Sequence, residues 1–344
     1  MRILVTGASG FVAEHLLPEL EGHHVTGVDR NDEASGPCDE FISFDLVADD
    51  FAKLPSDFDL VIHMAAARAD WGVDDEEFMR DNFVATQNLL NYILHSECRK
   101  LVFVSTVAVY EKDKSRFKPV TEQAEEAPYN AYGKSKHLAE QFIIQKCREN
   151  PTLCVNIIRP VVIYGPSNPS NTGIYRAVDN NIFRLIDGIY NDRFAIIGTG
   201  TSRKSIAYVK NFADAVIFLS DPVEGYEITH YSDDPTYDMH TLCSKVNSLL
   251  GKPKRLRRLN KSLILPIVYI LDLISSVTKI NFPISRSRIE TFMSNTDFDA
   301  QKIRKGGYTQ RYSNDTALSD TVAWYLDLRM TEKQNFFFFK KSKR

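Results

Sequence analysis

A glycine-rich turn between an apolar strand and a helix, close to the start of the chain, restricts the fold more than any other feature. The apolar residues 3–5 are followed by Thr-Gly-Ala-Ser-Gly and then by a helix-like stretch from about residue 11. Glycines at 7 and 10 allow a tight turn and a close approach of the backbone to a bound group. The helix N-terminus that follows presents unpaired N–H groups and a partial positive charge. The turn therefore predicts a binding site for the diphosphate of a dinucleotide.

Apolar strands alternate with helices through the first half of the chain. Helices are expected over 75–96 and 130–150, and strands over 2–7, 23–30, 39–46, 59–66, 100–110 and 153–165. Such alternation is typical of a parallel sheet that is covered on both faces. We therefore expect the α/β class, with a Rossmann doubly wound parallel sheet and a smaller C-terminal α/β lobe that binds the substrate.

The regular alternation weakens after Tyr-Gly-Pro at 164–166, where loops rich in Asn, Ser and Gly begin. This change predicts a dinucleotide-binding domain over 1–166 and a second lobe mainly over 167–330. The segment 204–220 is expected to return to the first domain, and residues 331–344 form a tail. The last nine residues, FFFFKKSKR, are compatible with a weak interfacial tether, a partner contact or a remnant of an expression vector.

Composition excludes several classes of function. The 344 residues carry a formal net charge of −3, which gives no electrostatic attraction toward nucleic acid. The five cysteines form no CxxC pair, so we expect free thiols and no metal site. Because the first strand begins at residue 2, no signal peptide fits, and we expect a reducing, cytoplasmic compartment. The apolar run 263–277 is short and contains Pro266 and Asp272, which predicts a helix packed on the protein and no transmembrane span.

Residues after the second and third expected strands bear on the choice of dinucleotide. Asp29 ends the second strand, 22 residues after Gly7. A carboxylate there accepts hydrogen bonds from the adenosine ribose and repels a 2′-phosphate, which favours NAD over NADP. Arg30 lies beside it and keeps NADP open as the alternative. Asp45 is placed to contact the adenine in the same crevice.

Tyr132 and Lys136 lie four residues apart at the start of an expected helix and therefore share one of its faces. A lysine ammonium near a phenol favours the phenolate and lowers its pKa from about 10 toward neutrality. The tyrosine can then act as an acid and a base. Ser105 and Thr106 end a strand upstream, where a hydroxyl can hydrogen-bond the substrate oxygen that gains or loses the proton.

These motifs occur in the order found in a known family, which the chain resembles. It is similar to the extended short-chain dehydrogenase/reductases, in the NAD-dependent epimerase/dehydratase group that acts on nucleotide sugars. The resemblance extends over roughly the first 210 residues and rests on Asp29 together with TGASGFVA (6–13), FDL (44–46), HMAAA (63–67), DNFVATQNLL (81–90), STVAVY (105–110), YGKSK (132–136) and RPVVIYGP (159–166).

The resemblance implies a role for each matching residue. Tyr132 would be the acid and base, and Lys136 would hold the nicotinamide ribose and tune the phenol. Thr106 would orient the substrate oxygen, with Ser105 as the neighbouring alternative. The cofactor contacts would come from Gly7, Ser9, Gly10, Phe11, Val12, Asp29, Arg30, Asp45, Leu46, Met64, Ala65, Ala66, Asn82, Ser105, Tyr132, Lys136 and Pro160. The substrate contacts would come from Ala67, Thr106, Asn171, Arg203 and Lys204.

The two residues after Thr106 bear on the type of reaction. Dehydratases and decarboxylases of this group carry an acid at this point, whereas Val107 and Ala108 cannot move a proton. The resemblance therefore implies a 4-epimerase that oxidises a sugar hydroxyl to a transient 4-keto intermediate with NAD and reduces it again from the opposite face. A nucleotide 4-ketosugar reductase that uses NAD(P)H is the alternative, because it needs the same residues. A 3β-hydroxysteroid dehydrogenase-like enzyme and a dinucleotide-binding sensor without activity are further candidates.

The resemblance also implies partners. Arg203 and Lys204 match the stretch whose basic residue meets the diphosphate of a nucleotide-diphosphate sugar, although Asn211 replaces the usual carboxylate. The later segment 283–308 is similar to the C-terminal part of epimerase-like enzymes from polysaccharide gene clusters and would close the substrate lobe. Two helices, 76–96 and 129–149, resemble those that pair in homodimers of the family.

Overall fold

The structure is a computed structural model of the chain. It describes residues 1–68, 73–111, 118–167, 181–252, 256–264, 266, 269 and 293–341, with side chains described as far as residue 331. Asn171 and most of the apolar run 263–277 lie outside the described residues. In the described part of the chain, no helix combines the length and the apolar character that crossing a membrane requires.

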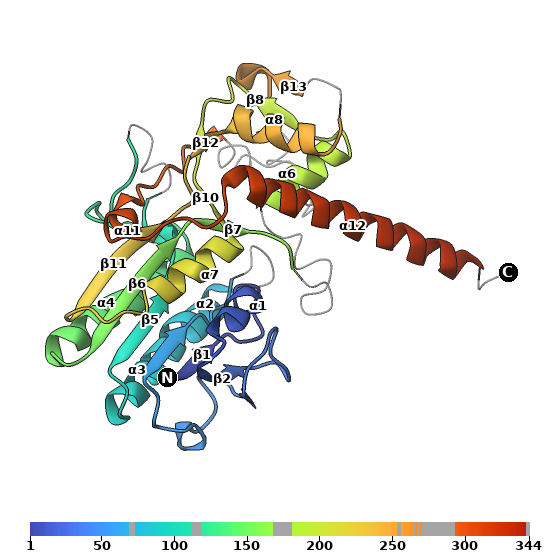
Figure 1. Ribbon diagram of the computed structural model, residues 1–344. Coiled ribbons are helices and arrows are strands. Elements are labelled where there is room, and N and C mark those ends of the chain that lie inside the picture. The colour runs from blue at the N-terminus through green and yellow to red at the C-terminus, as the bar shows by residue number, and fades with distance from the viewer. Residues whose placement is uncertain are drawn as a thin grey trace.

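A sheet of seven parallel strands forms the centre of the larger domain (Figure 1). Its strands are β1 (Arg2–Thr6), β2 (His24–Asp29), β3 (Glu40–Ser43), β4 (Leu60–His63), β5 (Lys100–Val104), β6 (Cys154–Pro160) and β11 (Tyr226–Tyr231). They lie in the order β11-β6-β5-β4-β1-β2-β3. The chain builds outward from β1 to β3 and then crosses back to β4. This reversal opens a crevice at the carboxyl ends of β1 and β4, where α/β sheets bind their ligands.

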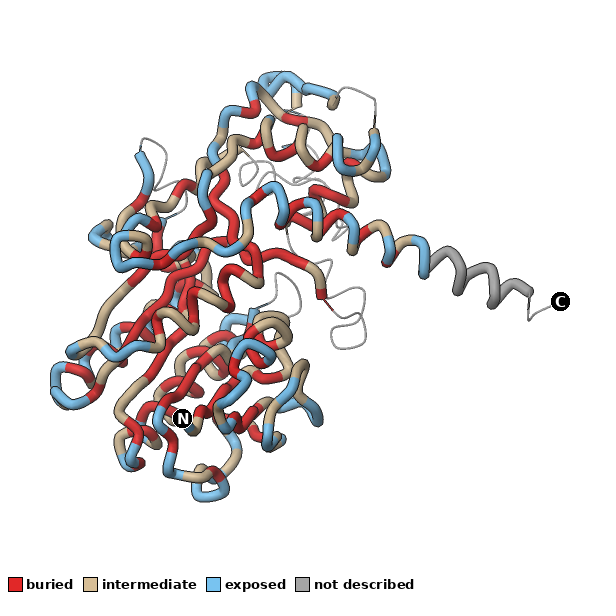
Figure 2. The backbone as a smooth tube through the Cα atoms, in the orientation of Figure 1, coloured by how far each residue is buried: buried red, intermediate tan, exposed pale blue. Residues whose placement is uncertain are grey.

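Helices cover both faces of the sheet, and the strand residues alternate between them. On one face lie α1 (Ala13–Leu16), η1 (Leu17–Leu20) and α7 (Val209–Phe218); on the other lie α3 (Ala85–His95) and α4 (Ala131–Glu149). Ile3 and Val5 pack with α1 and α7, whereas Leu4 between them packs with α3 and α4. Figure 2 shows these strands as the buried centre of the domain. The expected Rossmann architecture is therefore present.

A smaller lobe has a core of its own. It contains α6 (Asn181–Tyr190), α8 (Met239–Leu249), the parallel pair β8 (Ala195–Ile197) and β13 (Arg257–Leu259), and the first turns of α12 (Asn314–Lys341). Two short pairs connect it to the sheet domain: β7 (Val162–Tyr164) with β10 (Ile206–Tyr208), and β9 (Arg203–Lys204) with β12 (Tyr237–Asp238). Helix α12 extends outward from this lobe (Figure 1).

Several elements differ from those expected. The single strand expected over 153–165 divides at Val161: β6 joins the central sheet, and β7 pairs with β10 instead. The long helix expected over 75–96 comprises α2 (Asp75–Phe78), a π-helical segment η3 (Met79–Val84) and α3. After residue 208 the chain returns to the sheet domain, where α7 packs on α1 and β11 supplies the seventh strand.

Candidate active site

The loop after β1 has the geometry expected of a diphosphate-binding turn. Gly7 has φ +76°, and a Cβ built there would lie 2.7 Å from the Ala65 nitrogen, so only glycine fits. The Gly10 N–H donates to the Gly7 carbonyl at 3.0 Å, which closes the turn. The N–H groups of Phe11 and Val12, at the start of the helix, have no acceptor among the described residues. These two donors suit an anionic group.

A cavity of about 160 Å³, the glycine-loop cavity, opens beside this loop. Many residues predicted to bind the cofactor line it: Gly7, Gly10, Asp29, Arg30, Asp45, Leu46, Met64, Ala65 and Ala66. Asp81 of η3 lines it as well. The Asp29 carboxylate accepts hydrogen bonds from the N–H groups of Ser9 (3.2 Å) and Asn31 (3.1 Å). Asp29 is thereby fixed at the end of β2, at the edge of the cavity.

The hydroxyl of Thr106 and the phenol of Tyr132 meet beyond the carboxyl end of β5. Thr106 caps the short turn η4 (Val107–Val109) and hydrogen-bonds the Tyr132 side chain. Tyr132 lies in the first turn of α4, and its ring packs against Phe78 with centroids 5.9 Å apart. A Cβ at Gly133 would lie 2.2 Å from the carbonyl oxygen of the η4 turn, so glycine lets α4 approach closely enough to bring these groups together.

Lys136 lies one turn further along α4 and is almost completely buried. Its ammonium donates to the Val104 carbonyl at 2.7 Å and lies over the Phe103 ring, 4.5 Å from the centroid. Burial lowers the pKa of Lys136 to about 7, although the Glu140 carboxylate acts in the opposite direction. The lysine is therefore held at the end of β5 with a charge that changes near neutral pH.

The pKa of Tyr132 differs from expectation. We expected Lys136 to lower it toward neutrality, but burial raises the pKa of the phenol above its ordinary value. The positive charge of Arg68 and the hydrogen bond from Thr106 both act to lower it and are outweighed by burial. Removing a phenol from water disfavours the phenolate more than the neighbouring charges of the protein favour it. Arg68, which the sequence reasoning missed, directly follows the HMAAA motif.

Asn82 links the loop after β4, which lines the cavity, to helix α4, which bears Tyr132 and Lys136. Its amide accepts from the Ala67 N–H (2.7 Å) and donates to the Ala67 carbonyl (3.2 Å). It also donates to the Ser135 hydroxyl of α4 at 2.9 Å. The π-helical segment that carries Asn82 is a type of distortion often found at functional sites. Asn82 thus fixes the loop after β4 to the helix that bears Tyr132.

Ser105 belongs to a buried network rather than to the open part of the site. Its hydroxyl donates to Glu140, which also accepts from the Arg159 guanidinium (Nε to Oε1, 2.9 Å). Arg159 further contacts Glu126 and donates to the Tyr110 hydroxyl at 2.6 Å. Pro160, predicted to contact the cofactor, is buried beside this network at the end of β6. This arrangement favours Thr106 over Ser105 as the hydroxyl that faces a substrate.

The predicted diphosphate contacts of the second lobe already have protein partners. Arg203 Nε lies 2.5 Å from the Asp297 carboxylate, and Lys204 is buried with its ammonium 2.5 Å from the Ser294 carbonyl. The segment around Asp297 also reaches the sheet domain, because Phe298 packs on the ring of Tyr110 at 6.0 Å. In this arrangement both cations hold the segment 294–297 in place.

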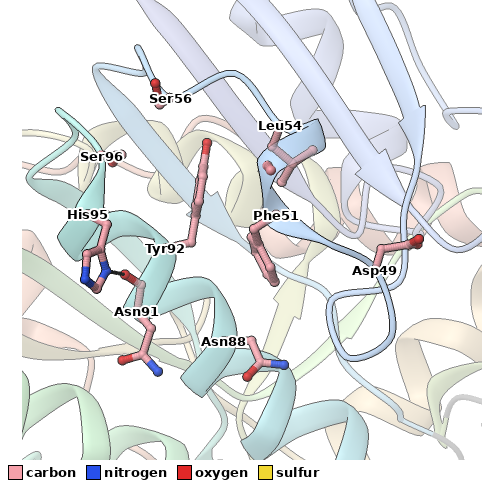
Figure 3. Close-up of a pocket in the computed structure, with 10 residues that line it drawn as sticks. Asp49, Phe51, Leu54, Ser56, Asn88, Asn91, Tyr92, His95 and Ser96 are labelled. Carbon is pink, nitrogen blue, oxygen red and sulfur yellow. Dashed lines mark hydrogen bonds between the residues drawn. The ribbon is translucent and has the colours of Figure 1, made fainter.

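A second and larger depression, of about 550 Å³, lies between the short helix η2 (Phe51–Lys53) and α3 (Figure 3). Asn88, Asn91 and Tyr92 line it, and none of its lining residues belongs to the glycine-loop cavity. The Tyr92 hydroxyl donates to the Pro55 carbonyl. This depression therefore contains none of the predicted site residues.

Comparison with known proteins agrees with this geometry. The sequence model that describes the NAD dependent epimerase/dehydratase family matches residues 3–231 of this chain. N-acetyl-alpha-D-glucosaminyl-diphospho-ditrans,octacis-undecaprenol 4-epimerase of Escherichia coli O157:H7 is 29% identical over 327 residues, which cover 94% of each chain. UDP-glucose 4-epimerase of Caenorhabditis elegans is 25% identical over 299 residues, which cover 73% of this chain and 84% of that protein.

The fold also has solved counterparts. The crystal structure of UDP-glucuronic acid 4-epimerase from Bacillus cereus in complex with NAD superposes with a TM-score of 0.71 at 23% identity. The superposition covers 94% of this chain and 96% of that one. This likeness concerns the fold, and the family match covers most of the chain. The chain therefore belongs to the NAD dependent epimerase/dehydratase family.

Proposed function

We propose that the protein is an NAD-dependent 4-epimerase of a nucleotide-diphosphate sugar, and that UDP is the nucleotide. The observation that carries this proposal is the hydrogen bond between Thr106 and Tyr132, together with Lys136 one turn further along α4, where its ammonium is held at the end of β5. The relatives support the reaction, because the Escherichia coli and Caenorhabditis elegans enzymes reported above are both 4-epimerases. Val107 and Ala108, which offer no further acid, support epimerisation over elimination.

The residues present fit NAD. The Phe11 and Val12 N–H groups suit its diphosphate, and the Gly7 position leaves no room for a side chain. The Asp29 carboxylate lies at the cavity edge, where it would bind the adenosine ribose. Lys136, at the end of β5, would bind the nicotinamide ribose. When bound, NAD would supply the acceptor that takes the C4 hydrogen of the sugar with its electron pair and gives it back.

The protein's own residues would handle the proton. In the oxidising half, the Tyr132 phenolate takes the proton of the C4 hydroxyl, while Thr106 hydrogen-bonds the same oxygen and orients it. The carbon–hydrogen bond breaks as the C4 carbonyl forms. In the reducing half the 4-keto sugar has turned over, the hydrogen returns to its other face, and Tyr132 gives the proton back to the oxygen. Atoms and electrons are unchanged over the cycle, and only the configuration at C4 differs.

A diphospho-polyprenol carrier is a second candidate for the group attached to the sugar. The relative that matches 94% of both chains acts on a sugar diphosphate joined to undecaprenol. This chain also exposes large apolar side chains within its apolar run 263–277: Leu263 is 69% exposed and Tyr269 is 52% exposed. Such side chains suit a lipid-borne substrate better than a fully hydrated one. The sugar chemistry at Tyr132 is the same for both carriers.

The reaction is tested with purified protein, NAD and a panel of UDP-hexoses and UDP-N-acetylhexosamines, followed by NMR of the sugar. We expect two C4 epimers to reach equilibrium with no net reduction of NAD. The Tyr132→Phe variant should lose about 10²–10⁴-fold in turnover because it removes the acid and base. Tyr129→Phe, which changes an exposed tyrosine three residues away, should keep wild-type turnover. Undiminished turnover by Tyr132→Phe contradicts the proposal.

The same assay separates the alternatives. Turnover only of a 4-keto sugar, with consumption of stoichiometric NAD(P)H, would identify a reductase instead. A sugar diphosphate on a short polyprenol, presented in detergent, tests the carrier against UDP. A higher kcat/KM for the polyprenol substrate would identify the lipid carrier.

We also propose that the protein acts in the cytoplasm as a homodimer that pairs through helices α3 and α4. Light scattering on protein eluted from a size-exclusion column measures its molar mass and so tests the dimer. Charge substitutions on the outer faces of α3 and α4 should convert the dimer to a monomer.

A further inference from the structure

Three aspartates and two arginines meet at the adenosine end of the cavity. The Asp45 carboxylate lies 2.7 Å from Arg80 Nη2, and Arg80 Nη1 lies 3.0 Å from Asp81 Oδ1. On its other side, Asp81 Oδ2 lies 2.9 Å from Arg30 Nη2. With Asp29 next to Arg30, these five residues form the pocket charge cluster, which carries one net negative charge when all are ionised.

Asp81 is the buried member of this cluster. Its side chain is 7% exposed, whereas the side chain of Arg30 is 50% exposed and reaches Asp81 from the end of β2. A buried carboxylate attracts a guanidinium more strongly than an exposed carboxylate does, because solvent screens the pair less. Arg30 therefore has a fixed partner on the neighbouring helical segment, although by sequence it stands next to Asp29.

This pairing changes what Arg30 can do for a cofactor. A 2′-phosphate on the adenosine ribose would meet the Asp29 carboxylate, and it would need a cation to offset the repulsion. The adjacent residue Arg30 is suited to that task by chemistry and position. In the structure, however, a phosphate would have to compete with Asp81 for the same guanidinium.

We propose that Asp81 determines the preference for NAD over NADP, by engaging the Arg30 guanidinium and by adding a third carboxylate, beside those of Asp29 and Asp45, to the adenosine pocket. The inference rests on the proposed use of NAD. It assigns the selectivity to a residue of η3, distant in sequence from the β2 end where such selectivity is usually sought. Asp81 acts here as a specificity-determining residue and has no part in the proton transfer.

The test measures binding and needs no turnover. Protein stripped of nucleotide is equilibrated with equal concentrations of NAD and NADP, and the bound nucleotides are separated and quantified. Asp81→Asn should raise the bound NADP/NAD ratio by about tenfold or more, since a hydrogen bond to a charged phosphate becomes available. Asp57→Asn is the matched control: it removes an aspartate that also pairs with an arginine, Arg2 at 3.1 Å, but that does not line the cavity. Its ratio should equal that of the wild type.

A double-mutant cycle identifies the cation. Arg30→Ala should leave the NADP/NAD ratio of the wild type within about twofold, and it should abolish the gain in the Asp81→Asn background. An unchanged ratio in folded Asp81→Asn overturns the inference, as does an equal loss of NADP binding on removing Arg30 in both backgrounds. If Asp81→Asn does not fold, Arg30→Ala alone decides the matter: a wild-type NADP/NAD ratio agrees with an Arg30 that Asp81 already engages, and a loss of NADP binding overturns the inference. Failure of the wild type to bind either nucleotide would instead overturn the proposed function and this inference with it.

Discussion

Removing the Glu140 carboxylate should destabilise the protein far more than removing an exposed carboxylate from the same helix. Both Glu140 and Arg159 are 0% exposed, and Arg159 contacts Glu140 through two of its nitrogens. Taking away one partner of a buried pair costs about 3–5 kcal/mol when the remaining charge is left uncompensated. Glu126, the other carboxylate that contacts Arg159, is partly exposed and compensates the buried guanidinium less well than Glu140 does. The Ser105 hydroxyl loses its acceptor at the same time, which adds about 1 kcal/mol. We therefore expect Glu140→Leu to lower the free energy of unfolding by roughly 4–6 kcal/mol.

The assay is urea unfolding followed by circular dichroism, at a fixed nucleotide concentration because a bound ligand shifts the apparent stability. Glu149→Leu is the control: Glu149 ends the same helix, pairs with Lys146 at 2.7 Å and is exposed. It should change the unfolding midpoint very little. The double variant Glu140→Leu/Arg159→Met should be less destabilised than the sum of its single variants, with a coupling energy of about 0.5–3 kcal/mol. A loss below about 1 kcal/mol for Glu140→Leu would refute the reasoning, because it would mean that Glu126 alone compensates the Arg159 charge.

The remaining predictions concern the proposed reaction. Turnover should rise with pH above neutrality, because burial raises the pKa of Tyr132 and the phenolate that accepts the proton becomes more abundant as pH increases. Arg68→Gln should shift this rise in the pH–rate profile to higher pH, since it removes a charge that lowers the pKa of Tyr132, and an unmoved profile would contradict the assignment. Lys136→Met should weaken NAD binding measured by calorimetry as well as turnover; normal binding would exclude its role at the ribose. Gly133→Ala should lower turnover and stability, because its Cβ would lie 2.2 Å from a carbonyl oxygen, whereas Gly188→Ala, with its nearest neighbour at 3.3 Å, should cost less in a thermal melt.

The fold was predictable because its signals are local. The alternation of apolar strands with helices predicts a parallel sheet, and the glycine turn at residues 7–10 predicts which end of β1 binds a ligand. The spacing of Tyr132 and Lys136 needs only the periodicity of one helix. These features depend on residues close together in the sequence, so the sequence alone was sufficient to place them.

The rest depends on contacts that cross the fold. Ser105 meets Glu140 across 35 positions of the sequence, and no local pattern distinguishes that pairing from exposure to a ligand. Burial, which is a property of the whole domain, reversed the expected direction of the Tyr132 pKa shift. Arg203 was predicted from a motif, but its partner Asp297 lies 94 residues away. Glu140 lies four residues after Lys136 in the same helix, but its pairing with Arg159 depends on β6 lying beside that helix, which the sequence does not show.

The π-helical turn η3 directs two consecutive side chains to different parts of the site. Asp81 lines the adenosine pocket, whereas Asn82 holds the backbone of Ala67 and the Ser135 hydroxyl of α4, the helix that bears Tyr132. The widened turn accommodates one more residue than an ordinary α-helical turn, and in this way both side chains find their targets. Deleting a single residue from Met79–Val84 would bring the turn back to the usual pitch and put these two parts of the site out of phase. The one additional residue in η3 therefore determines how the part of the site that would hold the nucleotide is positioned relative to the part where the sugar would be epimerised.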